Sequence, residues 1–510
     1  MKSHMLISIF VAGLLLVTGC TKDFDEINTN PNSSQQVDQP QLLLPAILKN
    51  SVRNYFYSST TRGNIVGDYY ANQYVSGFDN AWAPSEVQGY FLWDNFSQLR
   101  DVENLLVLSR KKQLQNFEGV GLVIKAWLFQ VMTDIYGDIP FKEATGAKVN
   151  GVFLPVFDTQ EDVYYGMLDM LKTANTLLTN GKDGLSGDIM LENKPLRWRM
   201  FANSLRLRLL MRISGKSNLK INVGTEINAI ISDPVQFPIF TSHENQAAFT
   251  FLNDVGFEIP GFNDAPLNDI HLSVTMEKYL KALNDPRIGY YASPTPAGIR
   301  DGKKVFAGVP NGIAAGAEAV YNGGRDFQSS VSPALLPLAS FPQASRTAAQ
   351  GLLMTYAEVQ FILAEARERG LISSGDAATY YANGIKDQFA YLAERIAGKF
   401  DYPKAADITP ADSYYTQTGV AYTGTPAEKL NKIRIQKWFA LFNNGFEGWS
   451  EWRRTGVPAD IKTGPNSAIT VWPRRARYPI SEQRLNQQHY QEAVSRQGAD
   501  DMLTRIWWDK

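Results

Sequence analysis

The stretch "VGLVIKAWLFQVMTDIYGDIP", residues 120–140, shows the clearest helical pattern in the chain. Its apolar side chains recur at spacings of three and four residues, which places them on one face of an α-helix. They are Val120, Val123, Ile124, Trp127, Leu128, Val131 and Ile135. Gly137 is suited to end the helix, and Pro140 follows just beyond it. The stretch therefore predicts an amphipathic helix with one face in a hydrophobic core.

The same period recurs further along the chain. "RWRMFANSLRLRLLMRIS", residues 197–214, and "MTYAEVQFILAEARERG", residues 354–370, predict two more helices. Asp376 is a natural N-cap for another, whose apolar stripe is Tyr381, Ile385, Phe389, Leu392 and Ile396. Helix, short turn, helix is the unit of tetratricopeptide arrays, although no strict repeat of about 34 residues is present. Strand signals are few, so the sequence predicts a mainly α protein.

Two regions lack this helical period. Residues 292–351 are rich in Gly, Pro, Ala and Ser, and residues 401–428 are similar but shorter. Long irregular segments inside a compact domain are commonly functional, and binding residues concentrate on loops held by a rigid scaffold. We therefore expect the helices to form the scaffold and these loops to carry the function.

The N-terminus has the pattern of an export signal. Lys2 precedes an essentially apolar run from Met5 to Val17, which is shorter than the roughly 20 residues of a transmembrane helix. A short basic start and a short apolar run are typical of a signal peptide. The run ends in "VTGC", residues 17–20, which resembles the lipobox of bacterial lipoproteins. In that family the signal is cut before the cysteine, so Cys20 is the expected lipidation site; the alternative is an ordinary signal peptide with a buried thiol nearby.

The residues after the cysteine predict a tether. "KDFDE", residues 22–26, resembles the lysine-plus-acid signal that sends some lipoproteins to the outer face of the outer membrane; the alternative is a solvated acidic leader. Residues 27–41 are rich in Asn, Gln, Ser and Pro and have little to bury. The expected organisation is a signal peptide at 1–19, a lipidated flexible tether at 20–41 and a single domain at 42–510.

Composition excludes several function classes. The net charge is −1, from 50 basic and 51 acidic residues, so nothing indicates nucleic-acid binding. The single cysteine excludes a disulfide framework. An apolar content of 44% is ample for a large core. No other stretch of the sequence approaches the length of a transmembrane helix, so the lipid is the expected attachment to the membrane.

No catalytic constellation stands out in the sequence. His243, His271 and His489 lack metal-ligand spacing, so neither a metal nor a cofactor is expected. "SGKS", residues 214–217, has Leu210 where a phosphate-binding loop needs glycine, so we interpret it as a helix-terminal turn. The carboxylate pair of a glycoside hydrolase is defined by distance in space, so the sequence leaves that activity open.

Charged residues on the predicted helices are interpreted as ion pairs. Glu358 and Glu365 lie seven apart on one helix face, where interhelical ion pairing is favoured over catalysis. A second group could suggest an anion site, but its members spread over several helix faces. That group is Arg197, Arg199, Arg206, Arg208 and Arg212.

Several longer segments follow one another in a specific order. They are "AWLFQVMTDIYGDIPFKEA", "RWRMFANSLRLRLLMRIS", "NDPRIGYYASP", "TYAEVQFILAEA", "IRIQKWFALFNNGFEGWSEWRRTGVP" and "RRARYPISEQRLNQQHYQEA". With the lipobox and the closing "RIWWDK", they resemble the SusD/RagB family of outer-membrane lipoproteins, in its nutrient-binding SusD-like subgroup. Each motif is weak alone, but in series they are specific and cover nearly the whole mature chain.

The resemblance implies a mainly α, SusD-like fold, in which tetratricopeptide-type helix pairs support an irregular, loop-rich ligand-binding half. It implies a partner, a SusC-type TonB-dependent outer-membrane receptor, to which the lipoprotein delivers a captured oligomeric nutrient. No enzymatic activity and no cofactor are implied. The motif residues look like scaffold, because aromatic side chains at helical spacing usually belong to a core; they include Trp127, Gly137, Trp438, Trp449 and Trp452.

Four functions compete. The leading hypothesis is surface capture of glycans, whose flat C–H faces stack on exposed Trp and Tyr side chains, an amphipathic surface of the kind that interfaces also recruit. A close alternative is the same import role for peptides. A surface glycoside hydrolase and a purely adhesive protein are the other two.

Aromatic residues in the predicted loops are the candidate ligand-binding residues. The segment "YYANQYVSGFDNAWAPSEVQGYFLW", residues 69–93, surrounds a turn-rich centre. Its candidates are Phe78, Asp79, Asn80 and Trp82, and the later loops add Tyr290, Tyr291, Tyr321, Arg325 and Phe327. The alternative is that these rings fasten the loops onto the helical scaffold.

Overall fold

The computed structural model describes residues 38–72, 82, 92–252, 254, 256–260, 270–314, 316–317, 320–335 and 347–510. The expected signal peptide, Cys20 and most of the expected tether lie outside these residues. The first described helix, α3 (Pro40–Ser58), has proline at its first position, which suits a helix start. This helix starts two residues before position 42, within the stretch expected to be the tether.

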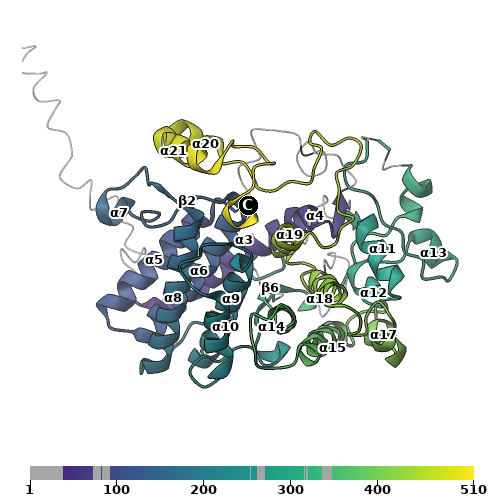
Figure 1. The fold of residues 1–510 in the computed structure, drawn as a ribbon, viewed down its shortest axis with the longest axis horizontal. Helices are drawn as coiled ribbons and strands as arrows, with labels where there is room; N and C mark the ends of the chain where they lie inside the picture. Colours follow the sequence, from purple (N-terminus) through teal and green to yellow (C-terminus); the bar gives the residue numbers. More distant parts are fainter. Residues whose placement is uncertain are drawn as a thin grey trace, which may run out of the picture.

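Antiparallel helix pairs form the larger part of the molecule (Figure 1). The predicted helix at 120–135 is observed as α6 (Gln115–Tyr136), which ends at Gly137 as expected. It packs against the preceding and following long helices, and a second group of pairs lies beside this one. The first group is α5 (Asn95–Lys111), α6, α8 (Gln160–Asn180), α9 (Pro195–Ile213) and α10 (Val223–Ser232). The second is α14 (Tyr356–Glu368), α15 (Ala377–Ile396), α18 (Pro426–Ala440) and α19 (Gly445–Thr455).

The predicted apolar stripes are buried. All five stripe residues of α15 lie in the core, and the side chain of Asp376 caps the helix by accepting from the Thr379 amide. The motif tryptophans are buried as well, from Trp438 at 0% exposed to Trp452 at 7%. The prediction that they belong to the scaffold is confirmed.

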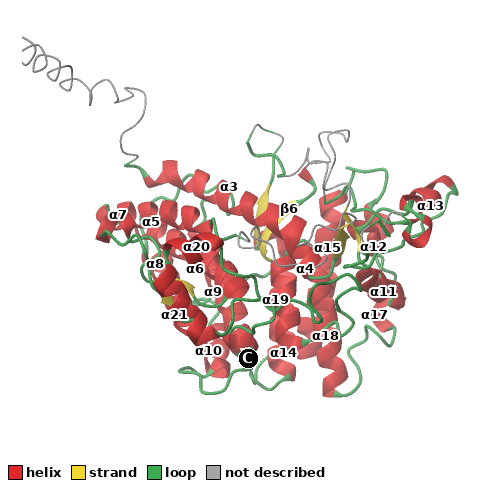
Figure 2. Ribbon diagram, turned by 90° about the horizontal axis from the view of Figure 1, so that it is seen from above, coloured by secondary structure: helices red, strands yellow, loops and turns green. Residues whose placement is uncertain are grey.

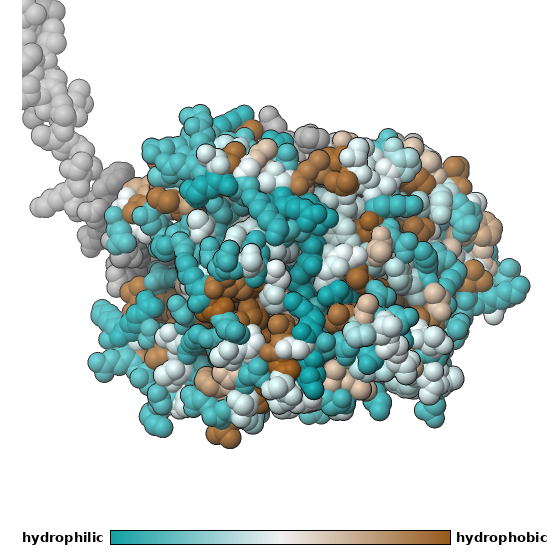
Figure 3. Space-filling model, viewed as in Figure 1, coloured by the Kyte–Doolittle hydropathy of each residue, from teal (hydrophilic) through white to brown (hydrophobic). Residues whose placement is uncertain are grey.

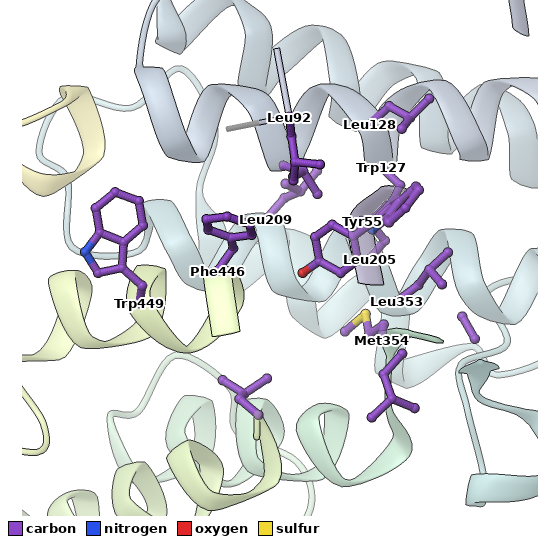
Figure 4. Close-up of a cluster of buried hydrophobic side chains, with 14 of the residues drawn as sticks. Tyr55, Leu92, Trp127, Leu128, Leu205, Leu209, Leu353, Met354, Phe446 and Trp449 are labelled. Atoms are coloured by element: carbon purple, nitrogen blue, oxygen red, sulfur yellow. The ribbon is translucent and has the colours of Figure 1, made fainter. Parts of the chain in front are cut away.

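One part of the core joins elements that are distant in sequence (Figure 4). Tyr55 of α3 meets Trp127 of α6 edge to face, with ring centroids 5.2 Å apart. Around this pair the picture shows leucines of α9, residues of a strand and Phe446 of α19. An aromatic pair of this kind adds about 0.5–1.5 kcal/mol beyond its buried area. The α3 helix thereby holds the two groups of helices together.

Buried ion pairs connect the same helices. Arg208 of α9 donates to Glu358 of α14 through two nitrogens, at 2.6 and 2.7 Å, and Arg454 of α19 pairs with Glu365 at 2.5 Å. Burial opposes ionisation of Glu365, but Arg454 outweighs it and lowers the pKa of that carboxyl to about 2. The expectation that the two glutamates form interhelical ion pairs is confirmed.

The arginine group of α9 also serves structure. Arg206 pairs with Glu226 and Arg212 with Glu447, as Arg208 does with Glu358. Arg197 pairs with Glu192 at 2.8 Å, and Arg199 instead donates to two backbone carbonyls. These arginines are used as ion-pair and carbonyl partners and do not converge on an anion site.

Two backbones cross closely where α19 begins. A π-helical turn, η1 (Ser59–Gly63), and the short α4 (Asn64–Val66) follow α3 and lie against the first turn of α19. A Cβ atom on Gly445 would lie 2.1 Å from the carbonyl carbon of Gly63, closer than any side chain allows. The crossing therefore requires glycine at position 445.

The other half of the molecule is irregular, as predicted. In Figures 1 and 2 it lies at the end away from α5. Its helices are short: α11 (Val274–Ala282), α12 (Ile288–Tyr291), α13 (Pro296–Arg300), α16 (Ala405–Ile408) and α17 (Asp412–Thr416). It also holds the turns η5 (Tyr321–Gly323) and η6 (Arg325–Phe327).

The strands are few and form two-stranded antiparallel pairs. They are β1 (Tyr70–Asn72) with β5 (Ile270–Leu272), β2 (Ile139–Pro140) with β3 (Phe157–Asp158), and β4 (Ala247–Thr250) with β6 (Gln350–Met354). The register places Tyr70 opposite Leu272 and Phe249 opposite Gly351. A mainly α fold with an irregular half is thus observed.

Five further helical elements complete the described structure. They are α7 (Ala147–Asn150), α20 (Ile480–Leu485), α21 (Gln487–Gln497) and the 3₁₀ turns η3 (His243–Asn245) and η8 (Trp507–Asp509). The C-terminal Trp508 returns to the core, where its indole donates to Asp134 at 2.9 Å. Within the described ranges, no helix is both long and apolar enough to cross a membrane.

Candidate functional site

Trp82 is buried in the structure. Its side chain is 2% exposed and its ring meets Trp472 edge to face at 5.2 Å. Its backbone has a φ of 50° and lies outside helices and strands, in agreement with the loop prediction. The buried ring presents no open face for stacking, so Trp82 has the position of a loop anchor. Its neighbouring candidates Phe78, Asp79 and Asn80 lie outside the described residues.

Tyr290 and Tyr291 are also anchors. Both belong to α12 and are buried, at 3% and 1% exposed. The Tyr291 hydroxyl donates to the Phe439 carbonyl at 2.9 Å, and its ring stacks on Phe442 with centroids 3.9 Å apart. Burial raises the pKa of both phenols. Both rings are therefore buried in this structure, and Tyr291 fastens α12 to α18.

Tyr321, Arg325 and Phe327 lie together on the surface of the irregular half. They occupy the adjacent turns η5 and η6, and Phe327 is 47% exposed. The Phe327 ring lies against Gly323, 3.0 Å from where a Cβ atom would stand. We call Tyr321, Gly323, Arg325 and Phe327 the aromatic turn. Of the sequence-predicted candidates, these are the ones that the structure brings together at an exposed position.

Side-chain hydrogen bonds fix the conformation of the aromatic turn. The Asn322 amide donates to the Phe327 carbonyl at 2.8 Å, and the Gln328 amide donates to the Tyr321 carbonyl at 2.9 Å. Asp326 accepts from Arg300 of α13 at 2.8 Å. An exposed ring on a turn held in this way, with polar neighbours, suits stacking on the apolar face of a sugar.

A cavity of about 580 Å³ opens near the aromatic turn, in the loop between α15 and α16. Its lining is Ala397, Gly398, Lys399, Phe400, Asp401, Tyr402, Lys404, Ala405 and Ala406. The size falls within the roughly 300–1,000 Å³ of small-molecule sites. We call it the 397–406 cavity.

The segment around α13 connects the cavity with the aromatic turn. Arg300 binds the turn through Asp326, while Lys304 lies 4.8 Å from the Tyr402 ring and pairs with Asp407 at 2.5 Å. The Thr295 amide donates to the Val305 carbonyl at 2.7 Å and closes the segment on itself. One rigid turn therefore contacts both features.

The cavity residues were not predicted from the sequence. Phe400 and Tyr402 stand beside lysines and a glycine at the edge of the irregular region 401–428. Aromatic residues beside lysines and a glycine suggest a binding loop, but the sequence does not show that these side chains enclose a cavity.

The described residues offer little for catalysis or metal binding. Within them no group of three or more His, Cys, Asp or Glu side chains could hold a metal ion. His271, in β5, is buried, and burial lowers the pKa of its imidazole to about 4. Glu358 and Glu365 are occupied by arginines.

The described surface is mixed in polarity. On the face shown in Figure 3, hydrophobic residues lie in several small groups among hydrophilic ones. Exposed apolar side chains beside the aromatic turn include Val320 and Ile299. Phe153, in the loop after α7, is exposed at the other end of the molecule.

Comparisons with known structures agree with this architecture. A SusD homologue from Bacteroides fragilis is 25% identical, with a TM-score of 0.76 over 93% of this chain and 100% of that one. A chitin-binding protein is 26% identical, with a TM-score of 0.77 over 92% and 100% of the two chains. A chitin-binding SusD homologue from Flavobacterium johnsoniae is 25% identical, with a TM-score of 0.73 over 92% and 98%. No curated protein matches the chain.

A family model matches most of the sequence. Residues 31–479 match the SusD-like family described as "Starch-binding associating with outer membrane". The match spans both the helical scaffold and the irregular half. The chain belongs to this SusD-like family of outer-membrane-associated nutrient-binding proteins.

Proposed function

We propose that this protein captures oligosaccharides at the cell surface and delivers them to a SusC-type TonB-dependent transporter in the outer membrane. The observation that carries the proposal is the aromatic turn, where Phe327 is half exposed and held rigidly beside polar side chains. Two relatives of similar structure are described as chitin-binding, which supports a glycan as the ligand class.

Binding without covalent chemistry fits the described site. A glycan ligand needs a flat apolar surface for the sugar ring and hydrogen-bonding groups for its hydroxyls. The aromatic turn supplies the first through Phe327 and Tyr321 and the second through Asn322 and Arg325. The family consists of binding proteins, so we propose that the chain itself does not cleave the glycan.

Membrane attachment is proposed to occur through lipid on Cys20. A single acyl chain anchors only marginally, whereas two or more hold a protein durably. A Cys20→Ser variant should be released from the membrane fraction or remain uncleaved. Full membrane retention of the mature form of that variant would contradict the anchor. Protease added to intact cells should remove the wild-type protein if it faces outward.

The ligand-binding proposal is tested with Phe327→Ala. We expect this variant to lose about 2 kcal/mol of binding free energy, roughly thirtyfold in affinity, as truncation of an aromatic anchor typically does. A glycan screen on the full chain first identifies the ligand, and calorimetry then compares the variants. Phe153→Ala removes another exposed phenylalanine, 78% exposed, and should bind normally.

Two results would contradict the proposal. Equal affinities of wild type and Phe327→Ala would remove the aromatic turn from the site. Binding of peptides but of no glycan would replace the ligand class by the peptide alternative.

The transporter is tested separately. Mild detergent extracts should yield a complex of this protein with a large TonB-dependent receptor. Recovery of the protein alone from several mild detergents would contradict the delivery role, while leaving glycan capture intact.

A further inference from the structure

The 397–406 cavity carries an excess of positive charge. Among the described residues, neither Lys399 nor Lys404 has a carboxylate within ion-pair distance, although both line the cavity. The guanidinium of Arg395, one helical turn before Lys399, donates to the carbonyls of Thr347 and Ala348 and so keeps its charge uncompensated.

The nearby acids are mostly occupied. Asp407 pairs with Lys304, and Glu394 contacts His243 at 3.1 Å. Asp401 is the remaining carboxylate in the cavity lining. The cavity lining therefore holds two lysines and one carboxylate, a local charge of about +1 by this count, and Arg395 adds a further cation just outside the lining.

Partial burial makes the unpaired positive charge of Lys399 less favourable. Partial burial and then the neighbouring Arg395 lower the pKa of its ammonium, and the distant carboxylate of Glu394 only partly offsets them. A cation that is partly desolvated beside another cation gains more from an incoming anion than a solvated surface lysine does. The position favours a ligand that brings negative charge.

Two aromatic rings stand in the same lining. Phe400 and Tyr402 are both half-buried, so part of each side chain remains accessible. Lys304, 4.8 Å from the Tyr402 ring centroid, holds that ring in place from outside the cavity lining. An aromatic surface beside cations matches a ligand with an apolar ring face and an acidic substituent.

We propose that the 397–406 cavity binds an anionic oligosaccharide, with its acid group on Lys399 and Lys404 and a sugar ring against Tyr402. This inference rests on the proposed capture of glycans and names their chemical class. Uronic acids and sulfated sugars both supply the required anion on a ring with C–H faces. The volume of about 580 Å³ accommodates a short segment of a chain, and its open side lets the chain continue.

A neutral glycan satisfies the site less well. Its hydroxyls would leave the two ammonium groups without a counter-charge in a partly buried position. A hydrogen bond between a charged donor and a charged acceptor is stronger than one to a neutral hydroxyl. The cavity therefore discriminates by charge.

The test is calorimetric titration of the full chain, purified in detergent, with three hexasaccharides. An oligogalacturonate carries carboxylates only, a carrageenan oligomer carries sulfates only, and cellohexaose is neutral. We expect binding of at least one anionic probe, at least tenfold tighter than cellohexaose and weakened by salt. Carboxylate and sulfate are distinguished by which probe binds.

The matched variants are Lys399→Gln with Lys404→Gln, and Lys182→Gln as a control. The double variant should lose about tenfold or more in affinity for the anionic probe and lose most of the salt dependence. Neither ammonium group forms an ion pair with a described carboxylate, so the melting temperature should change little. Lys182, exposed in the loop after α8, should be dispensable. Tyr402→Ala should weaken the same probe.

Each contrary outcome has a distinct meaning. Tight binding of cellohexaose with no preference for anions would overturn this inference and leave glycan capture standing. Anionic binding that is unchanged in the double variant would place the anion elsewhere and overturn the cavity assignment. Binding of an acidic peptide with no glycan binding would overturn both the inference and the proposed function.

Discussion

The two halves of the molecule treat aromatic and charged side chains in opposite ways. In the helical half, Arg208 and Glu358 neutralise each other in the core, and Trp438 is completely buried. In the irregular half, Phe327 lies half in solvent and Lys399 has no carboxylate partner within the described residues. Residue type alone therefore does not indicate function. A side chain is available for binding when it is exposed and is not already paired within the folded protein.

The comparison predicts that truncating a buried charged partner has the largest effect on stability. Glu358→Ala leaves the guanidinium of Arg208 buried without its carboxylate. We expect a loss of about 4 kcal/mol in the free energy of unfolding, the size typical of breaking a buried ion pair. Chemical denaturation monitored by circular dichroism measures it. As a control, Glu192→Ala removes one partner of an exposed ion pair and should leave the denaturation curve unchanged. If Glu358→Ala is as stable as the wild type, the buried ion pair is dispensable.

Substitution of Trp82 tests whether this side chain stabilises the fold or contacts the ligand. Trp82→Ala should cost about 3 kcal/mol of stability, because it leaves a cavity against Trp472. Phe327→Ala, by contrast, should affect ligand affinity and hardly change stability. Thermal unfolding and calorimetric binding on both variants separate the two roles. If Trp82→Ala melts like the wild type and loses binding, Trp82 is a ligand contact after all.

Asp68 gives an effect that depends on pH and is small per pH unit. It is buried, accepts from the Asn311 amide at 2.7 Å, and burial raises the pKa of its carboxyl to about 7. The folded state therefore keeps a proton that the unfolded state releases above about pH 4. Stability should fall between about pH 4 and 7, by up to about 1.4 kcal/mol per pH unit from this group, and then level off.

Asp68→Asn should remove that slope. Asparagine stays neutral, tolerates the φ of 57° at this position, and can still accept from Asn311. Denaturation curves at several pH values measure the slope, with Asp169→Asn on the exposed side of α8 as the control. A slope that persists in Asp68→Asn would assign the pH dependence to other groups.

Most of the fold could be predicted because helical period is a local signal. Spacings of three and four around Trp127 and Phe389 identified helices whose stripes are buried as expected. The burial of Tyr290 and Tyr291 could not be predicted in this way. They follow a turn-like sequence, and Tyr291 contacts Phe439 and Phe442, over 140 positions away in the chain.

The candidate site was predicted only in part for the same reason. Phe327 was named from its glycine-rich surroundings, and its exposure follows from contacts within a few residues. Tyr402 was missed because its role depends on Lys304 and on the enclosure formed by a whole loop. The exposure of a side chain usually depends on contacts between distant parts of the chain. Binding residues are therefore predicted best from sequence where a local turn alone determines whether the side chain is exposed.

The crossing of Gly445 over Gly63 separates what can change from what cannot. A single methyl group at position 445 would push apart α19 and the segment after α3, and every helix pair that rests on them. The exposed side chains of the aromatic turn and the lysines of the 397–406 cavity are under no such constraint, although Gly323, Gly324 and Gly398 keep a positive φ there. We expect substitutions of these loop side chains to alter ligand preference without destabilising the fold. Ligand preference can therefore evolve faster than the helical scaffold.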